Sequence, residues 1–316
     1  MEKGELAFVR WLREVCRSDP ARVRIGIGDD MAAVALDGQL VTVTADMLLD
    51  GVHFDTNRHK PEQIGKKAIG ASLSDCAAMA CRPRGAVVSV ALPDTMSMEE
   101  AKGLFSGMLH MGEKFNCPII GGDTTSWSHP LAIDVSMLGE PMSKYGPIRR
   151  HGARPGDALL VTGELGGSLL GKHMAFTPRL ADAEFLVTEF TGFVHAMIDI
   201  TDGVVLDAFR LCEASGCSAV LDAARLLSVA SDRARVAAQQ DGRSVLDHIL
   251  YDGEDFELLV AVAPEALAGL LRRAPRVPRM IGAIMPAAPD GRTEIELKQP
   301  DGRVEPLEPR GYEHFR

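Results

Sequence analysis

The order of apolar and polar positions in the first half of the chain predicts alternating helices and strands. Residues 5–16 fit a helix, and short apolar runs at 23–27 and 40–44 fit strands. Residues 61–80 form a helical stretch rich in small side chains, which indicates close packing of its backbone. Further strands are predicted at 86–92 and 131–137, with a helix between them that begins at the capping box of Ser97 and Glu100 and runs to about residue 115.

The second half repeats this alternation after a segment rich in proline and glycine at 141–156, which is typical of a linker. Val205, Ala208, Phe209 and Cys212 recur at the spacing of one helix face, and Gly216 can close that helix. Residues 168–191 show no readable pattern. Strands are predicted at 158–162, 196–200, 218–221, 256–262, 279–284 and 294–297, with a helix beginning at Pro264.

These elements predict a mixed α/β (α+β) protein of two domains. The chain has 316 residues, 46% of them hydrophobic, which is enough for two ordinary cores. We expect an N-terminal domain over residues 1–140, a linker over 141–156 and a C-terminal α/β domain over 157–316.

Composition excludes several classes of protein. The formal net charge of −10 leaves no broad basic surface for nucleic acid. No stretch approaches the roughly eighteen uninterrupted apolar residues of a membrane helix. Charged residues at positions 2, 3 and 5 stand where a signal peptide would have its apolar core, so we expect a cytoplasmic protein. The six cysteines form no CxxC pair, which argues against a disulfide framework and a structural zinc site.

Aspartates beside glycine or hydroxyl residues recur at apparent strand ends and helix starts. Carboxylates that converge repel one another unless cations neutralise them, and hard oxygen ligands of this kind suit Mg²⁺. Aspartate is also a common turn and N-cap residue, and Asp202 can simply cap the helix that follows it. Both readings are open for the aspartates at positions 29, 30, 46, 75, 123, 199 and 202.

The glycines near these aspartates also have two readings. Gly26-Ile27-Gly28 and residues 163–167 can be loops that bring backbone N–H groups to a phosphate, or they can be ordinary turns. The chain contains no GxxxxGK[ST] motif and no GxGxxG between a strand and a helix. A P-loop and a Rossmann nucleotide site are therefore excluded.

Several short motifs, taken in order, resemble the signature of the thiamine-monophosphate kinases over nearly the whole chain. Each motif is weak alone, but their order and spacing together are specific. The motifs are Gly4-Glu5, 25–30 (IGIGDD), 46–54 (DMLLDGVHF), 72–79 (SLSDCAAM) with Arg82-Pro83, 121–125 (GGDTT), 155–157 (PGD), 161–163 (VTG), 196–203 (AMIDITDG), 253–258 (GEDFEL) and 311–315 (GYEHF).

The resemblance implies an aminoimidazole ribonucleotide synthetase-like fold. In that fold the N-terminal domain pairs with its twin across a homodimer and forms a β-barrel at the interface, and the C-terminal α/β domain packs beside it. The implied reaction is the ATP-dependent phosphorylation of thiamine monophosphate to thiamine diphosphate, with ATP and several Mg²⁺ ions in the cleft between the domains.

The resemblance also implies the site residues. The metal ligands would be Asp30, Thr44, Asp46, Asp75, Asp123, Asp199 and Asp202. The residues at the ATP would be Gly122, Asp123, Arg150 and Thr201, and those at the thiamine phosphate would be His53, Glu254 and Tyr312. No general base is expected, because the attacking phosphate oxygen is already anionic.

Three positions depart from the usual family pattern. Ala45 stands where a hydroxyl residue is usual, Thr201 replaces a serine, and Phe256 replaces a tyrosine. The alternatives are another ATP-dependent enzyme of the superfamily, of the aminoimidazole ribonucleotide synthetase or selenophosphate synthetase type, and a non-catalytic nucleotide-binding protein. Ala45 is the residue that favours the non-catalytic reading.

Overall fold

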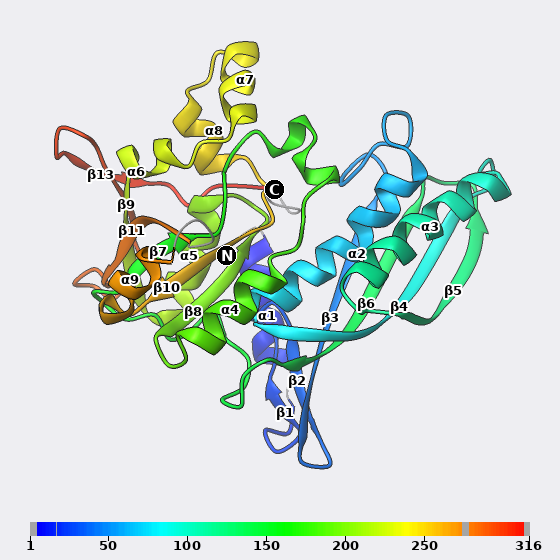
Figure 1. Cartoon of the computed structure of the whole chain (residues 1–316), viewed down its shortest axis with the longest axis horizontal. Coiled ribbons are helices and arrows are strands. Elements are labelled where there is room, and N and C mark those ends of the chain that lie inside the picture. Colours follow the sequence, from blue (N-terminus) through cyan, green and yellow to red (C-terminus); the bar gives the residue numbers. More distant parts are fainter. Residues whose placement is uncertain (1–4, 17, 274–277, 313–316) are drawn as a thin grey trace.

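The computed structural model describes residues 5–16, 18–273 and 278–312, which form two sheets with helices against them (Figure 1). The first sheet has the strand order β1-β2-β3-β6-β4-β5; β4 and β5 run parallel, and the other neighbours are antiparallel. The elements of this half are α1 (Glu5–Val15), β1 (Val23–Ile25), β2 (Ala32–Leu36), β3 (Gln39–Leu49), α2 (Pro61–Ala78), β4 (Cys81–Pro93), α3 (Met98–Lys114), β5 (Ile119–Trp127) and β6 (Ala132–Pro141).

The second sheet has the strand order β13-β12-β9-β11-β7-β10-β8 and is antiparallel except between β12 and β9. Its strands are β7 (Ala158–Val161), β8 (Val194–Ile200), β9 (Cys217–Asp222), β10 (Glu257–Val262), β11 (Arg279–Pro286), β12 (Ile295–Lys298) and β13 (Val304–Leu307). Its helices are the short 3₁₀ turns η1 (Ser168–Leu170) and η2 (Lys172–Met174), then α4 (Leu180–Glu189), α5 (Val204–Ser215), α6 (Ala223–Ser228), α7 (Asp232–Asp241), α8 (Val245–Tyr251) and α9 (Pro264–Leu271).

Helix α2 is the central element of the fold. It lies between the first sheet and α3, and it also contacts α4 and β8 of the second half (Figure 1). The small residues allow this packing, because a Cβ on Gly65 would lie 2.0 Å from the carbonyl oxygen of Leu104 in α3. The close backbone packing predicted for this stretch is confirmed.

One face of the first sheet is covered by α2, and the opposite face is open. Along β3, Thr44 and Leu48 are buried, whereas Met47 is 61% exposed, as expected for side chains that alternate between two faces. The strand register puts Leu138 of β6 and Val87 of β4 on the same open face as Met47, and both are 38% exposed. Exposed apolar side chains therefore stand on three neighbouring strands of the open face, together with the polar Asp134 and Ser136 of β6.

Most predicted elements are confirmed, including the capping box at Ser97 and the helix end at Gly216. The placement of the aspartates at element ends was wrong for three of them, because Asp46 lies within β3, Asp75 within α2 and Asp123 within β5. One buried apolar cluster contains residues of both halves. The domain limits at 140 and 157 stay a prediction.

In the described part of the chain, no helix is both long and apolar enough to cross a membrane.

Candidate active site

Three aspartates from separate elements converge where the two halves of the chain meet. Asp30 lies in the turn between β1 and β2, Asp75 in the last turns of α2, and Asp199 near the end of β8. Each offers a carboxylate oxygen, and these oxygens all lie within 4.8 Å of one another. The fold thus gathers three acidic groups that are far apart in the sequence.

Hydroxyl groups hold the carboxylates of this cluster in place. Ser74 donates to Asp199 at 2.6 Å, and Ser72 donates to Asp46 at 2.6 Å. Thr44 donates to Asp75. Ser74 belongs to α2 and Asp199 to β8, so this bond joins the two halves of the chain.

Thr44 was expected as a metal ligand, whereas Ser72 and Ser74 are site residues that were not predicted. The signal for both serines was present in the SLSD motif, in which two hydroxyls precede an aspartate within one helical turn.

Electrostatic repulsion is strong at this site. Burial raises the pKa of Asp46 to about 6. Burial also raises the pKa of Asp75 well above its usual range, and the charges of Asp46 and Asp199 raise it further. The pKa of Asp199 is raised by burial and by the charge of Asp30. Each of these carboxyl groups therefore holds its proton more tightly than an exposed one does unless a cation compensates its charge.

One protein cation already faces the cluster. Arg150 binds Asp30 through Nη2 at 2.6 Å and through Nε at 3.2 Å. Burial alone would lower the pKa of Arg150, but the charge of Asp30 outweighs it and raises this pKa. The remaining donors are carboxylate and hydroxyl oxygens with an excess of negative charge. That donor set fits Mg²⁺.

A cavity of about 580 Å³ opens beside the cluster. Its lining joins Asp30, Asp46, Asp75 and Asp199 to apolar and aromatic side chains. His53, Glu254 and Tyr312, which the resemblance assigns to one ligand, line this cavity together with Lys67 and Phe256.

A buried ion pair joins the two halves across this cavity. Lys67 of α2 is 1% exposed, and its Nζ lies 2.6 Å from Oε1 of Glu254. The same Nζ donates to the carbonyl oxygen of His53. Glu254 has a φ of 61°, a conformation that is uncommon for a residue with a side chain, and its backbone N–H donates to Thr201. The ion pair and the backbone bond fix Glu254 at the cavity wall.

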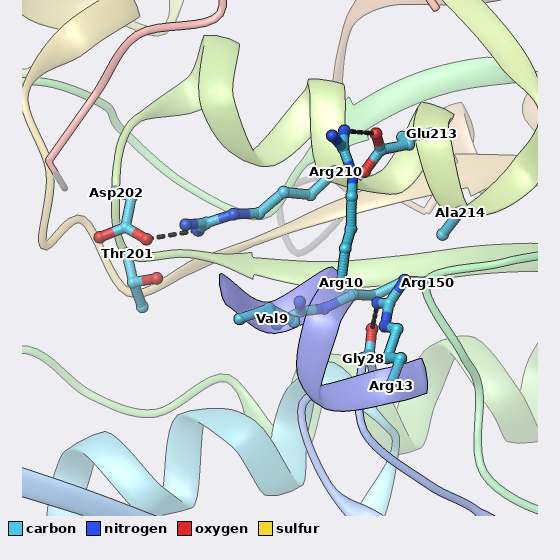
Figure 2. Close-up of a pocket in the computed structure, with 10 residues that line it drawn as sticks. All are labelled: Val9, Arg10, Arg13, Gly28, Arg150, Thr201, Asp202, Arg210, Glu213 and Ala214. Atoms are coloured by element: carbon cyan, nitrogen blue, oxygen red, sulfur yellow. Dashed lines mark hydrogen bonds and ion pairs between the residues drawn. The ribbon is translucent and has the colours of Figure 1, made fainter. Parts of the chain in front are cut away.

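A second pocket, of about 460 Å³, lies between α1, the turn at Gly28 and α5, and four arginines line it (Figure 2). Arg150, Thr201 and Asp202 line both this pocket and the acidic cavity. Asp202 does not cap α5, because the N-cap is Gly203; its carboxylate pairs with Arg210. The capping reading of Asp202 is thereby excluded.

The glycines at 163–167 form a turn that packs against the protein itself. The backbone N–H of Gly166 donates to both oxygens of Asp255 at 3.1 Å, and that of Gly167 donates to Asp252 at 3.0 Å. Because these N–H groups already bind side chains of the protein, the phosphate reading of this loop is not supported.

Gly122 and Asp123 do not join the acidic cluster within one chain. They lie in β5, the edge strand, and neither lines the acidic cavity. The register aligns Asp123 with Ser89, Asp134 and Met47 in one row on the open face of the sheet. Three strand spacings separate Asp123 from Met47, which is roughly 14 Å.

Residues 28–140 match the family model described as AIR synthase related protein, N-terminal domain. The chain is 37% identical over 319 residues to thiamine-monophosphate kinase of Rhodopirellula baltica, with 98% of this chain and 97% of that protein covered. The chain belongs to the thiamine-monophosphate kinase family. A second member, from Synechococcus elongatus, is 32% identical, with 99% of this chain and 97% of that protein covered.

The fold agrees with that of solved members of this family. A structure of AaThiL complexed with AMPPCP and TMP aligns with a TM-score of 0.82 and 25% identity, covering 99% of this chain and 97% of that chain. The predicted mixed α/β fold class is confirmed, and the β-barrel across a dimer stays a prediction. The roles of individual site residues in this thiamine-monophosphate kinase family member stay predictions.

Proposed function

We propose that the protein transfers the γ-phosphoryl group of ATP to thiamine monophosphate and forms thiamine diphosphate and ADP. The observation that carries this proposal is the convergence of Asp30, Asp75 and Asp199 beside a cavity with aromatic and acidic walls. Membership of the thiamine-monophosphate kinase family and the AaThiL complex with AMPPCP and TMP support it.

The cavity suits thiamine monophosphate as the acceptor. Thiamine carries a cationic thiazolium ring and a pyrimidine ring, and the cavity offers the carboxylate of Glu254 with the rings of His53, Phe256 and Tyr312. Phe256 stacks on Phe176 with ring centroids 3.8 Å apart, so its ring is held in place. The phenylalanine that departs from the family pattern therefore keeps a flat apolar wall.

Mg²⁺ would be held by Asp30, Asp75 and Asp199, with Asp46 beside them, and would neutralise the negative charge of the triphosphate. Arg150 stands at the junction of the acidic cavity and the arginine-lined pocket. It can exchange Asp30 for phosphate oxygens once other cations compensate Asp30.

The chain's part in the reaction is to align the two substrates. The acceptor phosphate oxygen is anionic, so it can attack the γ-phosphorus without a protein base. Lys67, held by Glu254 and His53, fixes the wall against which the acceptor lies. Alignment and charge compensation are the contributions that such a transfer requires.

A homodimer is part of this proposal, because Asp123 can reach an acidic cluster only from a second copy. The open face, on which Met47, Val87 and Leu138 are exposed, is the surface for that second copy, since exposed apolar side chains grouped on one face are typical of an interaction surface. A charge introduced on this face, Leu138→Glu, should shift the molar mass in solution from dimer to monomer. Leu227→Glu, at a 39% exposed leucine of α6, is the matched control and should remain dimeric. A dimer that persists in Leu138→Glu would contradict the use of this face.

The activity is tested by incubating the pure protein with Mg·ATP and thiamine monophosphate and separating the products, with a metal-free control. Metal-dependent formation of thiamine diphosphate and ADP in equal amounts is expected. ADP without thiamine diphosphate would indicate another ATP-dependent enzyme of the superfamily. ATP binding without turnover would favour a non-catalytic nucleotide-binding protein.

A further inference from the structure

The turn of residues 253–256, which leads into β10, holds two residues in a backbone conformation that is unusual for residues with side chains. Glu254 has a φ of 61° and Phe256 a φ of 51°. Such a conformation costs free energy, above all for a bulky residue, and it persists only where the surrounding contacts fix it. Both side chains line the acidic cavity. The backbone is therefore strained at the two positions where this turn forms the cavity wall.

Asp255, which stands between these two residues, faces away from the cavity. Its side chain is fully buried and does not line the cavity. Both carboxylate oxygens accept from the backbone N–H of Gly166 at 3.1 Å, and Oδ1 also accepts from the hydroxyl of Ser168 at 2.5 Å. Nζ of Lys172 lies 3.7 Å from Oδ1. All three partners belong to the loop of residues 163–172, so Asp255 ties the turn to this loop.

The loop brings a side chain of its own to the same cavity. Leu169 directly follows Ser168, is 61% exposed and lines the acidic cavity. Leu170 is 43% exposed and does not line it. Both leucines belong to η1, which is only three residues long. The position of Leu169 therefore depends on side-chain contacts such as the bond from Ser168 to Asp255.

The other contacts of the turn lead to different parts of the fold. The backbone N–H of Glu254 donates to the carbonyl oxygen of Thr201 at 2.6 Å, and that of Phe256 donates to Ile200 at 2.8 Å. These bonds join the turn to the end of β8. The ring of Phe256 stacks on Phe176, which lies beyond η2. Asp255 makes its contacts beside Leu169, so it sets one wall of the cavity against the other.

We propose that Asp255 is a positioning residue for the phosphoryl acceptor. Its buried carboxylate holds the turn, with Glu254 and Phe256, against the loop that carries Leu169. The three side chains then enclose the rings of thiamine monophosphate. This inference rests on the proposed function. A carboxylate, an aromatic face and an apolar side chain suit an acceptor with a cationic thiazolium ring. Asp255 itself does not touch the acceptor, whereas Leu169 does.

The test is the affinity of Asp255→Asn for thiamine monophosphate, measured by calorimetry in the presence of Mg²⁺. Asparagine keeps the shape of the side chain but puts an NH₂ group where one of the two oxygens accepts a hydrogen bond. The Kd of thiamine monophosphate should rise about tenfold. The Kd of ADP should stay within about twofold, because the residues expected at the nucleotide lie outside the turn and the loop.

Asp157→Asn is the matched control. Asp157 is also buried and also accepts from a backbone N–H, that of Arg154 at 2.8 Å, but it does not line the acidic cavity. Its melting temperature should fall, as that of Asp255→Asn should, because a buried hydrogen-bonded carboxylate is lost in both. Its Kd for thiamine monophosphate should stay within about twofold of that of the unchanged protein.

Leu169→Ala tests the same wall without a change at the buried carboxylate, and it decides the matter if Asp255→Asn does not fold. Loss of this apolar contact should raise the Kd of thiamine monophosphate about fivefold. Leu170→Ala makes the same change at the next exposed leucine, outside the cavity lining, and should bind thiamine monophosphate as the unchanged protein does.

Equal affinity for thiamine monophosphate in Asp255→Asn and the unchanged protein would overturn the inference. So would an equal loss of thiamine monophosphate and ADP affinity, which indicates a general disturbance of the fold, and so would unchanged affinity in Leu169→Ala. If the unchanged protein itself does not bind thiamine monophosphate, the proposed function fails as well. Failure of this inference alone is therefore distinguishable from failure of the proposed function.

Discussion

At the scale of single residues, the acidic cluster lowers the stability of the metal-free fold while it serves the reaction. The carboxylate of Asp75 is repelled by Asp46, Asp199 and Asp30, and this repulsion contributes to its raised pKa. Asp75→Asn should therefore lower turnover by roughly a hundredfold or more while the metal-free protein melts at the same or a higher temperature. Product formation and thermal unfolding of the same preparation test both parts. A folded Asp75→Asn variant with ordinary turnover would remove Asp75 from the site.

The sequence predicted some site residues well and missed others for a physical reason. Asp30, Asp75 and Asp199 stand in recognisable motifs, and the structure brings them together. Lys67 stands in a helix, where a lysine usually lies on the solvated face, so its burial against Glu254 depends on a contact 187 residues away. Arg150, Thr201 and Asp202 of the arginine-lined pocket were among the predicted site residues, whereas its other arginines were missed, because α1 and α5 meet only in the folded chain.

At the scale of elements, the segment from β7 to α4 is anchored by buried carboxylates, of which Glu257 binds three of its side chains. Glu257 of β10 is 1% exposed and accepts from Thr162 at 2.7 Å, Lys172 at 2.9 Å and Arg179 at 2.6 Å. Leu169, which lies inside this segment, lines the acidic cavity. Glu257 thus holds a stretch of cavity wall that has little regular structure of its own.

Glu257→Gln should destabilise the fold by about 3 kcal/mol, because it takes the nearest carboxylate from two partly buried cations, Lys172 and Arg179. Their other acidic partners, Asp255 and Asp182, lie farther away, at 3.7 Å. Thermal unfolding measures the loss, and limited proteolysis should cut first between residues 163 and 179. Glu189→Gln, which breaks the exposed pair with Arg273, is the control and should cost less than about 1 kcal/mol. Equal melting temperatures for the two variants would mean that Glu257 does not anchor this segment.

The elements that the sequence predicted are those with a strong local pattern, such as α3 with its capping box and β10 with six buried residues. The stretch between β7 and β8 was not readable. Its two 3₁₀ turns are three residues each, and they are held by distant side chains such as Asp255 and Glu257. Helix and strand propensities depend on the local sequence and do not predict such long-range contacts.

At the scale of the whole molecule, the acidic cluster links metal binding, pH and stability. Asp46, Asp75 and Asp199 have pKa values in the folded protein above those of an unfolded chain. A raised pKa means that the folded state binds protons more tightly, so these groups stabilise the metal-free fold at low pH. That contribution is lost as the pH rises through the folded pKa, which is about 6 for Asp46.

Mg²⁺ binds the deprotonated carboxylates and should reverse this loss. The increase in melting temperature on adding Mg²⁺ should therefore be small at pH 5 and should grow by several degrees between pH 5 and pH 7.5. Asp75→Asn should make the effect of Mg²⁺ on the melting temperature depend less on pH. The substitution removes the carboxylate whose pKa is raised by both Asp46 and Asp199. An Mg²⁺ effect of the same size at both pH values, or one that survives unchanged in Asp75→Asn, would place the metal elsewhere.

Because Asp30 and Asp75 lie in the first half of the chain and Asp199 in the second, the metal-dependent increase should appear as one cooperative transition in which both halves unfold together.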